Sequence, residues 1–70
     1  MIYLAGNLKI LRAKHFLSQE KFAEKLGIMR GTLASYESNR SEPSVSSLAR
    51  ICKILNISMD DMLSKDLSKI

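Results

Sequence analysis

A pair of short helices joined by one glycine constrains the fold of this chain more than any other feature. Ser18 can cap the first helix, over residues 19–26, by accepting a hydrogen bond from a free backbone N–H. Gly27 then ends this helix, because glycine adopts the left-handed conformation without steric cost. A second helix follows over residues 30–38. We expect the two helices to cross at Ala23, where a larger side chain would push them apart.

Apolar side chains give each of these two helices an inward face. Phe22 and Leu26 lie on one side of the first helix, and Leu33 and Tyr36 lie on one side of the second. A small residue, a glycine and apolar residues at these offsets are typical of a helix-turn-helix. The second helix of such a motif can enter the major groove of DNA.

Three further helices are predicted around this pair, and no strand. They cover residues 5–14, residues 45–55 after a Ser44 cap, and a short stretch after a Ser58 cap. Asn39 ends the 30–38 helix, and Pro43 prevents the helix from continuing. We therefore expect an all-α, five-helix domain that spans residues 1–70. Its core should cover about 4–63, and the weakly periodic tail at 64–70 should fray.

The charge of the chain favours a polyanionic partner. The formal net charge is +4, and residues 1–43 hold seven Lys or Arg against four Asp or Glu. Mild positive charge is also common among small soluble proteins, so charge alone does not identify the partner. Cys52 is the only cysteine, which fits a reducing cytoplasm. Neither a membrane span nor a signal peptide is predicted.

No pattern in the sequence indicates catalysis. The chain has no phosphate-binding glycine motif, no zinc-protease motif and no Ser/His/Asp set that could converge. His15, the sole histidine, has no neighbours at metal-ligand spacing, and Cys52 lies on the core side of its helix. We therefore expect no enzyme activity, no cofactor and no metal.

With its five helices placed, the chain resembles the lambda-repressor-like helix-turn-helix domains of phage repressors, Cro proteins and the XRE family of bacterial regulators. The resemblance covers about residues 4–63. It rests on LKILR (8–12), LSQEKFAEKLGI (17–28), TLASYE (32–37), EPS (42–44), LARICKIL (48–55) and ISMDDML (57–63). It implies a bacterial or phage transcriptional regulator, a repressor rather than an activator, that binds double-stranded DNA sequence-specifically as a homodimer.

The outward side of the 30–38 helix is expected to contact bases. Gly31, Ala34 and Ser35 share one side at i, i+3 and i+4, and Arg30 flanks them at the first turn. Of the four, Arg30 alone can make a bidentate bond to guanine, worth about 1–3 kcal/mol of discrimination. The alternative is a solvated helix face with no partner. Gly31 departs from the family, which usually has a larger side chain there.

The resemblance adds contacts to the DNA backbone and a structural ion pair. The backbone contacts expected are Ser18, Gln19, Thr32, Tyr36, Asn39 and Arg40. Arg12 and Glu37 match positions that pair in such domains. Met29 stands where the family usually has a capping Ser or Thr.

The expected dimer contact lies beyond the 30–38 helix, at Asn56, Ile57, Met59 and Met62, with Leu67 and Ile70 as further candidates. The rival prediction is an antitoxin or adaptor that uses the same fold mainly to bind protein, such as a toxin. The apolar N-terminal segment at residues 2–4 and the C-terminal tail at 64–70 would then contact the partner.

Overall fold

The computed structural model describes residues 2–69, in which the chain forms five α-helices and one short 3₁₀ turn. The elements are α1 (Leu4–Lys14), α2 (Gln19–Leu26), α3 (Arg30–Glu37), α4 (Val45–Ile54), α5 (Met59–Ser64) and η1 (Leu67–Lys69). No strand occurs in this part of the chain, so the predicted all-α, five-helix fold is confirmed. Within the same residues, no helix is both long enough and apolar enough to cross a membrane.

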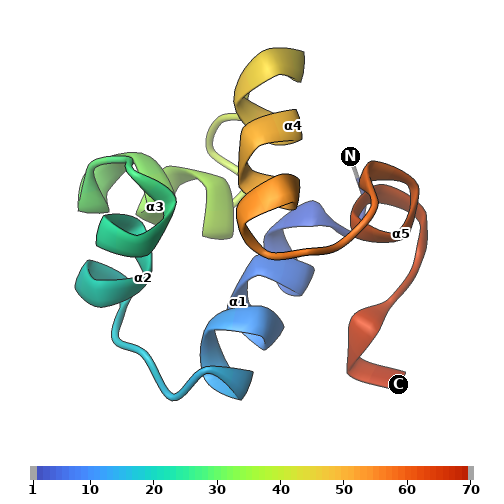
Figure 1. Cartoon of the computed structure of the whole chain (residues 1–70), viewed down its shortest axis with the longest axis horizontal. Coiled ribbons are helices and arrows are strands. Elements are labelled where there is room, and N and C mark those ends of the chain that lie inside the picture. Colours follow the sequence, from blue (N-terminus) through green and yellow to red (C-terminus); the bar gives the residue numbers. More distant parts are fainter. Residues whose placement is uncertain (1, 70) are drawn as a thin grey trace.

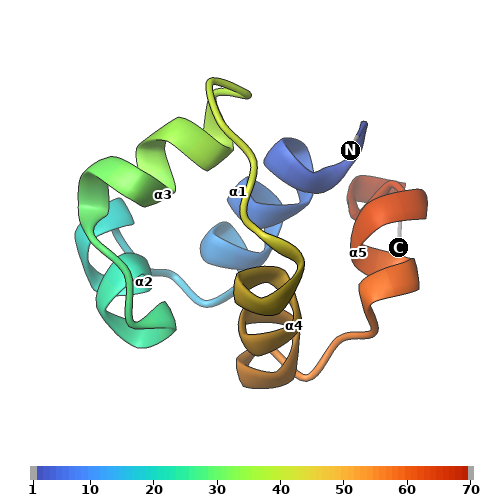
Figure 2. The ribbon, with the colours of Figure 1, turned by 90° about the horizontal axis from the view of Figure 1, so that it is seen from above.

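The helix α1 connects the two ends of the molecule. It packs against α3 on one side and against α5 and η1 on the other. Figures 1 and 2 both show α2 and α3 at one end, α5 at the opposite end, and α1 and α4 between them. The helix-turn-helix therefore forms one end of the domain, where the outer side of α3 is not covered by another helix.

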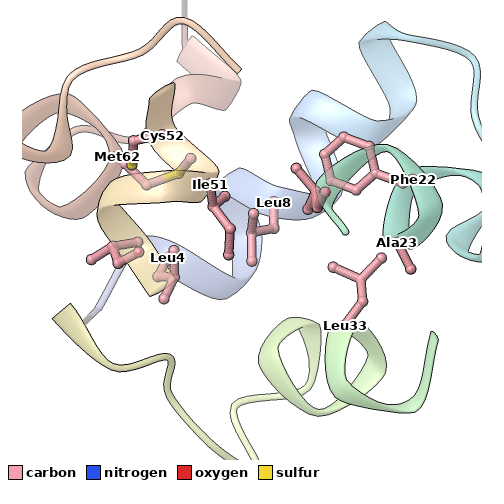
Figure 3. Packing of buried hydrophobic residues seen from close by; sticks show 10 residues of the cluster. Leu4, Leu8, Phe22, Ala23, Leu33, Ile51, Cys52 and Met62 are labelled. Atoms are coloured by element: carbon pink, nitrogen blue, oxygen red, sulfur yellow. The ribbon is translucent and has the colours of Figure 1, made fainter. Parts of the chain in front are cut away.

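One continuous core holds these helices together. Its fully buried apolar side chains are Leu8, Phe22, Leu26, Leu33, Leu48, Ile51 and Met62. In Figure 3, Leu8 lies between Ile51 and Phe22, so α1 joins the interior of the helix-turn-helix to that of α4 and α5. Because the core is shared, a change in α4 or α5 can alter how firmly α3 is held.

Serine side chains cap three of the helices, as predicted. Ser18, Ser44 and Ser58 each accept a hydrogen bond from the backbone N–H three residues further on. Met29 precedes α3 and makes no side-chain cap bond. The helix α3 therefore begins without this stabilisation, which is typically about 1 kcal/mol.

Four helix ends share one backbone arrangement, in which a residue of positive φ follows the helix. These residues are Phe16, Gly27, Asn39 and Asn56. In each case the next residue donates its N–H to the carbonyl five positions earlier, the bond of a Schellman motif. Glycine and asparagine tolerate this conformation, whereas Phe16, at φ 55°, pays about 1–2 kcal/mol of backbone strain. Its side chain is also 93% exposed, so packing does not offset the strain.

A buried asparagine binds the C-terminal segment to α1. The Nδ2 of Asn7 donates to the carbonyls of Met62 (2.8 Å) and Lys65 (2.7 Å), and its Oδ1 accepts from the N–H of Leu67 (3.0 Å). Leu67 is buried as well, so the packed core extends beyond residue 63. The prediction that the tail at 64–70 frays is therefore wrong up to residue 69. Residue 70 lies outside the described residues.

Candidate nucleic-acid interface

The corner between α2 and α3 is set by backbone geometry. Gly27 turns the chain with φ 71°, and the N–H of Ile28 bonds to the carbonyl of Ala23 at 3.0 Å. Ala23 is almost fully buried, and Figure 3 shows it beside Leu33 of α3. Its methyl group leaves room for the second helix, which is the role expected from the sequence.

The four residues predicted to contact bases all reach the surface of α3. Arg30 and Gly31 are exposed, while Ala34 and Ser35 are half-buried. Leu33 and Glu37 point into the domain on the other side of the helix. We call the surface formed by Arg30, Gly31, Ala34 and Ser35 the reading face.

Gly31 is not required by the packing of the monomer. A Cβ atom built at this position would meet nothing within 4 Å, and its backbone conformation is an ordinary helical one. The fold would therefore accept a larger side chain there. The effect of the glycine is instead to leave the backbone of α3 open to close approach by another molecule.

The expected ion pair between Arg12 and Glu37 is present behind the reading face. The Nε of Arg12 donates to Oε2 of Glu37 at 3.0 Å, and its Nη2 donates to Oε1 at 3.1 Å. This is a bidentate geometry, which gives the strongest pairs of this type. The carboxylate of Glu37 is only 3% exposed, so removal of Arg12 would leave a buried charge without its counterion.

The pair continues to the protein surface through Gln19, at the first position of α2. The Nε2 of Gln19 donates to Oε1 of Glu37 at 3.2 Å, and its Oε1 accepts from Nη1 of Arg30 at 3.2 Å. Both ends of this amide are therefore engaged within the protein. Sequence reasoning placed Gln19 on a phosphate and missed its bond to Arg30, because residues 11 positions apart meet only once the helices cross.

The loop after α3 presents a second cation beside the reading face. Asn39 adopts φ 62°, as predicted, and the N–H of Arg40 bonds to the carbonyl of Ser35 at 2.9 Å. The side chain of Arg40 remains exposed, whereas Pro43 is buried and anchors the end of the loop. The backbone of Arg40 is thus fixed to α3 while its guanidinium reaches solvent.

The other predicted backbone contacts differ in how accessible they are. Ser18 is exposed, and its hydroxyl accepts from the N–H of Lys21 at 3.2 Å, which leaves its own O–H free to donate. Thr32 and Tyr36 are half-buried on α3. The fold therefore brings Ser18, Gln19 and Arg30 together at the helix starts, and Arg40 to the far end of α3.

The predicted dimer contact requires a correction. Asn56 is exposed, and Ile57 and Met59 are half-buried, at the junction of α4 and α5. Met62 is fully buried in the core of the monomer and Leu67 is buried as well, so neither side chain is available to a partner. Ile70 lies outside the described residues. The helical periodicity of α5 identified an apolar side but could not distinguish the core of the monomer from an interface.

The part of the chain that the structure describes contains no grouping of three or more His, Cys, Asp or Glu that could hold a metal ion. Cys52 is buried in the core, and this burial raises the pKa of its thiol. A raised pKa disfavours the reactive thiolate at neutral pH.

Comparison with known proteins is consistent with this geometry. The sequence model of the helix-turn-helix family matches residues 8–62. The chain is 38% identical to the antitoxin PezA of Streptococcus pneumoniae serotype 4 over 63 residues, which are 90% of this chain and 40% of that protein. No solved structure matches the chain significantly.

Other relatives are described as HTH-type transcriptional regulators, among them two uncharacterized proteins. MJ0272 of Methanocaldococcus jannaschii is 34% identical over 59 residues, which are 84% of this chain and 89% of that protein. YqaE of Bacillus subtilis is 40% identical over 57 residues, which are 81% of this chain and 49% of that protein. The chain thus spans nearly all of MJ0272 but less than half of PezA and YqaE.

Proposed function

Because this chain belongs to the helix-turn-helix family, we propose that it is a transcriptional regulator that binds double-stranded DNA sequence-specifically and reads the major groove with α3. The observation that carries this proposal is the reading face itself. It lies at one end of the domain, begins with the exposed Arg30 and is flanked by the exposed Arg40. A helix presented in this way fits the width of the major groove.

Each part of this surface has a separate task in the proposal. Arg30 donates to O6 and N7 of a guanine, and Ala34 and Ser35 contact neighbouring base edges, with the methyl of Ala34 suited to thymine. Gly31 lets the helix backbone come close to the bases. Arg40 binds a phosphate on the far side of the groove, which adds affinity without base preference.

We further propose that the protein is a bacterial or phage repressor that acts in the cytoplasm as a homodimer. A repressor needs only to occupy its site, and two recognition helices about 34 Å apart would match one turn of B-DNA. Asn56, Ile57 and Met59 form the proposed contact, together with Ile54, which is exposed at the end of α4. No enzyme activity is part of this proposal.

The test is selection of duplexes from a random pool by the purified protein at two salt concentrations. We expect the Arg30→Ala variant to lose about 5- to 150-fold on the selected duplex and to relax preference at one base pair. Arg40→Ala should weaken every duplex alike and reduce the salt slope by about 1. If the wild-type protein enriches no sequence, the proposal is wrong.

Similarity to the antitoxin PezA supports a second candidate function, in which the domain binds a protein such as a toxin. The N-terminal segment expected to contact such a partner is only partly available. Ile2 is 85% exposed and Tyr3 lies at the surface, but Leu4 is buried in the core and is excluded. Under this reading the isolated domain would bind duplex DNA weakly and without sequence preference, which the same selection would reveal.

A further inference from the structure

One large apolar side chain is exposed to solvent directly beside the reading face. Met29 is 77% exposed and immediately precedes Arg30, the first residue of α3. Among the described residues with large, exposed apolar side chains, Met29 is the only one next to the reading face in the sequence. Packing within the monomer therefore does not account for an apolar side chain at this point.

Met29 does not stabilise the start of α3 either. It is the N-cap residue, with φ −74° and ψ 147°, and its side chain makes no cap bond. The capping serines of α2, α4 and α5 have nearly the same backbone conformation, with φ between −63° and −71° and ψ between 151° and 165°. A serine at position 29 would therefore fit and would add a cap bond. The apolar character of Met29 is thus available only to a partner.

The chemistry of methionine restricts what this side chain can contact on DNA. It has no N–H or O–H donor and its sulfur is a weak acceptor, so it cannot donate a hydrogen bond to a phosphate. The base edges in the major groove are hydrogen-bonding groups, except for the C5 methyl group of thymine. An unbranched, adaptable side chain can pack on such a methyl group, and the contact removes apolar surface of both from water.

The position of Met29 places this contact beside the guanine that Arg30 is proposed to bind. The Cα atoms of successive residues are about 3.8 Å apart, which is close to the spacing of about 3.4 Å between successive base pairs. The first residues of a recognition helix are the ones that reach base edges. Ala34 lies about one helical turn after Arg30, so its proposed thymine contact falls on a different base pair.

We propose that Met29 is a specificity-determining residue, which packs on the methyl group of a thymine adjacent to the guanine bound by Arg30. This inference rests on the proposed function and deepens it, because it adds one thymine at a defined place to the sequence that the domain selects. The contact involves no charge. It therefore adds base preference without adding salt dependence, in contrast to the phosphate contact proposed for Arg40.

The test uses the duplex selected by the wild-type protein, with each thymine replaced in turn by deoxyuridine, which lacks only the methyl group. The reference guanine is the one at the base pair whose preference Arg30→Ala relaxes. Removal of the methyl group beside it should weaken wild-type binding by about fourfold, the worth of one buried methyl group. Met29→Ala should abolish this effect, and Met29→Leu, which remains apolar, should retain it. The control Ala34→Gly should also retain it, because Ala34 contacts another base pair.

Met29→Ser separates recognition from folding. Its melting temperature should rise by about 4–8 °C, since the serine can cap α3, while the methyl effect should disappear. If deoxyuridine beside the guanine weakens the wild-type protein and Met29→Ala by the same factor, the inference is wrong although the proposed function stands. A selected duplex without thymine next to that guanine would overturn it equally. Failure of the wild-type protein to select any duplex overturns the proposed function as well.

Discussion

Replacement of Asn7 by alanine tests how the C-terminal segment is held. The side chain of Asn7 is almost fully buried and makes three hydrogen bonds, each to a backbone group more than 50 residues away. The shorter alanine removes all three. The carbonyl of Met62 and the N–H of Leu67 would then lose partners in the buried part of the contact.

The structure allows an estimate of the loss. The bond to Lys65 is only partly buried, so water can replace it at little cost. The two buried groups would each cost about 1–3 kcal/mol when left unpaired, so we expect a total near 3 kcal/mol. A domain of this length has about 3.5–10 kcal/mol of stability in all. The melting temperature should fall by about 12–24 °C.

Urea denaturation followed by circular dichroism would measure this change, and hydrogen exchange would report on the amide of Leu67. Lys9→Ala, an exposed truncation on the same helix, is the control and should stay within about 0.5 kcal/mol of wild type. Asn7→Asp keeps the acceptor for Leu67 but sets a carboxylate against two carbonyls, so its deficit should shrink as the pH falls and the introduced group protonates. A loss below about 1 kcal/mol for Asn7→Ala, with the Leu67 amide still protected, would refute the reasoning.

Phe16, Cys52 and the junction of α4 and α5 each allow a separate test. Phe16→Gly should raise the free energy of unfolding by about 1 kcal/mol, since it removes left-handed strain and no buried contact; an unchanged or lower urea midpoint would contradict this. Cys52 should alkylate far more slowly in the folded protein than in urea. Because burial raises the pKa of its thiol, the free energy of unfolding should decline as the pH rises through the ordinary pKa of a thiol toward the raised value. This decline should be smaller in Cys52→Ala. Ile54→Glu and Met59→Glu should shift a dimer toward monomer in sedimentation experiments, and an equilibrium that neither variant changes would exclude the proposed contact.

Hydrogen bonds join Arg12, Glu37, Gln19 and Arg30 in a series from the interior to the first residue of α3. Its inner pair holds α1 against α3, and its outer members meet where the predicted DNA contacts converge. Substitutions in this series therefore have to be judged by base preference as well as by stability. A variant that only loosens the fold should weaken the binding of every duplex by the same factor, whereas the loss of Arg30 itself should alter base preference with the fold intact.

Short-range physical chemistry was enough to place the helices and the corner. Local signals act over four or five residues, so their effects can be predicted from adjacent residues in the sequence. These signals are the helix periodicity, the serine caps, Gly27 and Asn39. The resemblance added the pairing of Arg12 with Glu37. Phe16 is the exception, because its residue type argues against the left-handed conformation that it adopts.

Tertiary packing alone decided whether the apolar side of α5 faces the core or a partner. It also decided which polar side chains form hydrogen bonds with each other. Met62 has the same periodicity whether it faces the core or a partner, and it is buried because α5 packs against both α1 and α4. Asn7 reaches residues 55 to 60 positions away, and Gln19 reaches Arg30 only across the corner. The sequence by itself thus determined the helices and their turns, whereas the contacts that hold the C-terminal segment and restrain Arg30 depend on distances that exist only after the helices have packed.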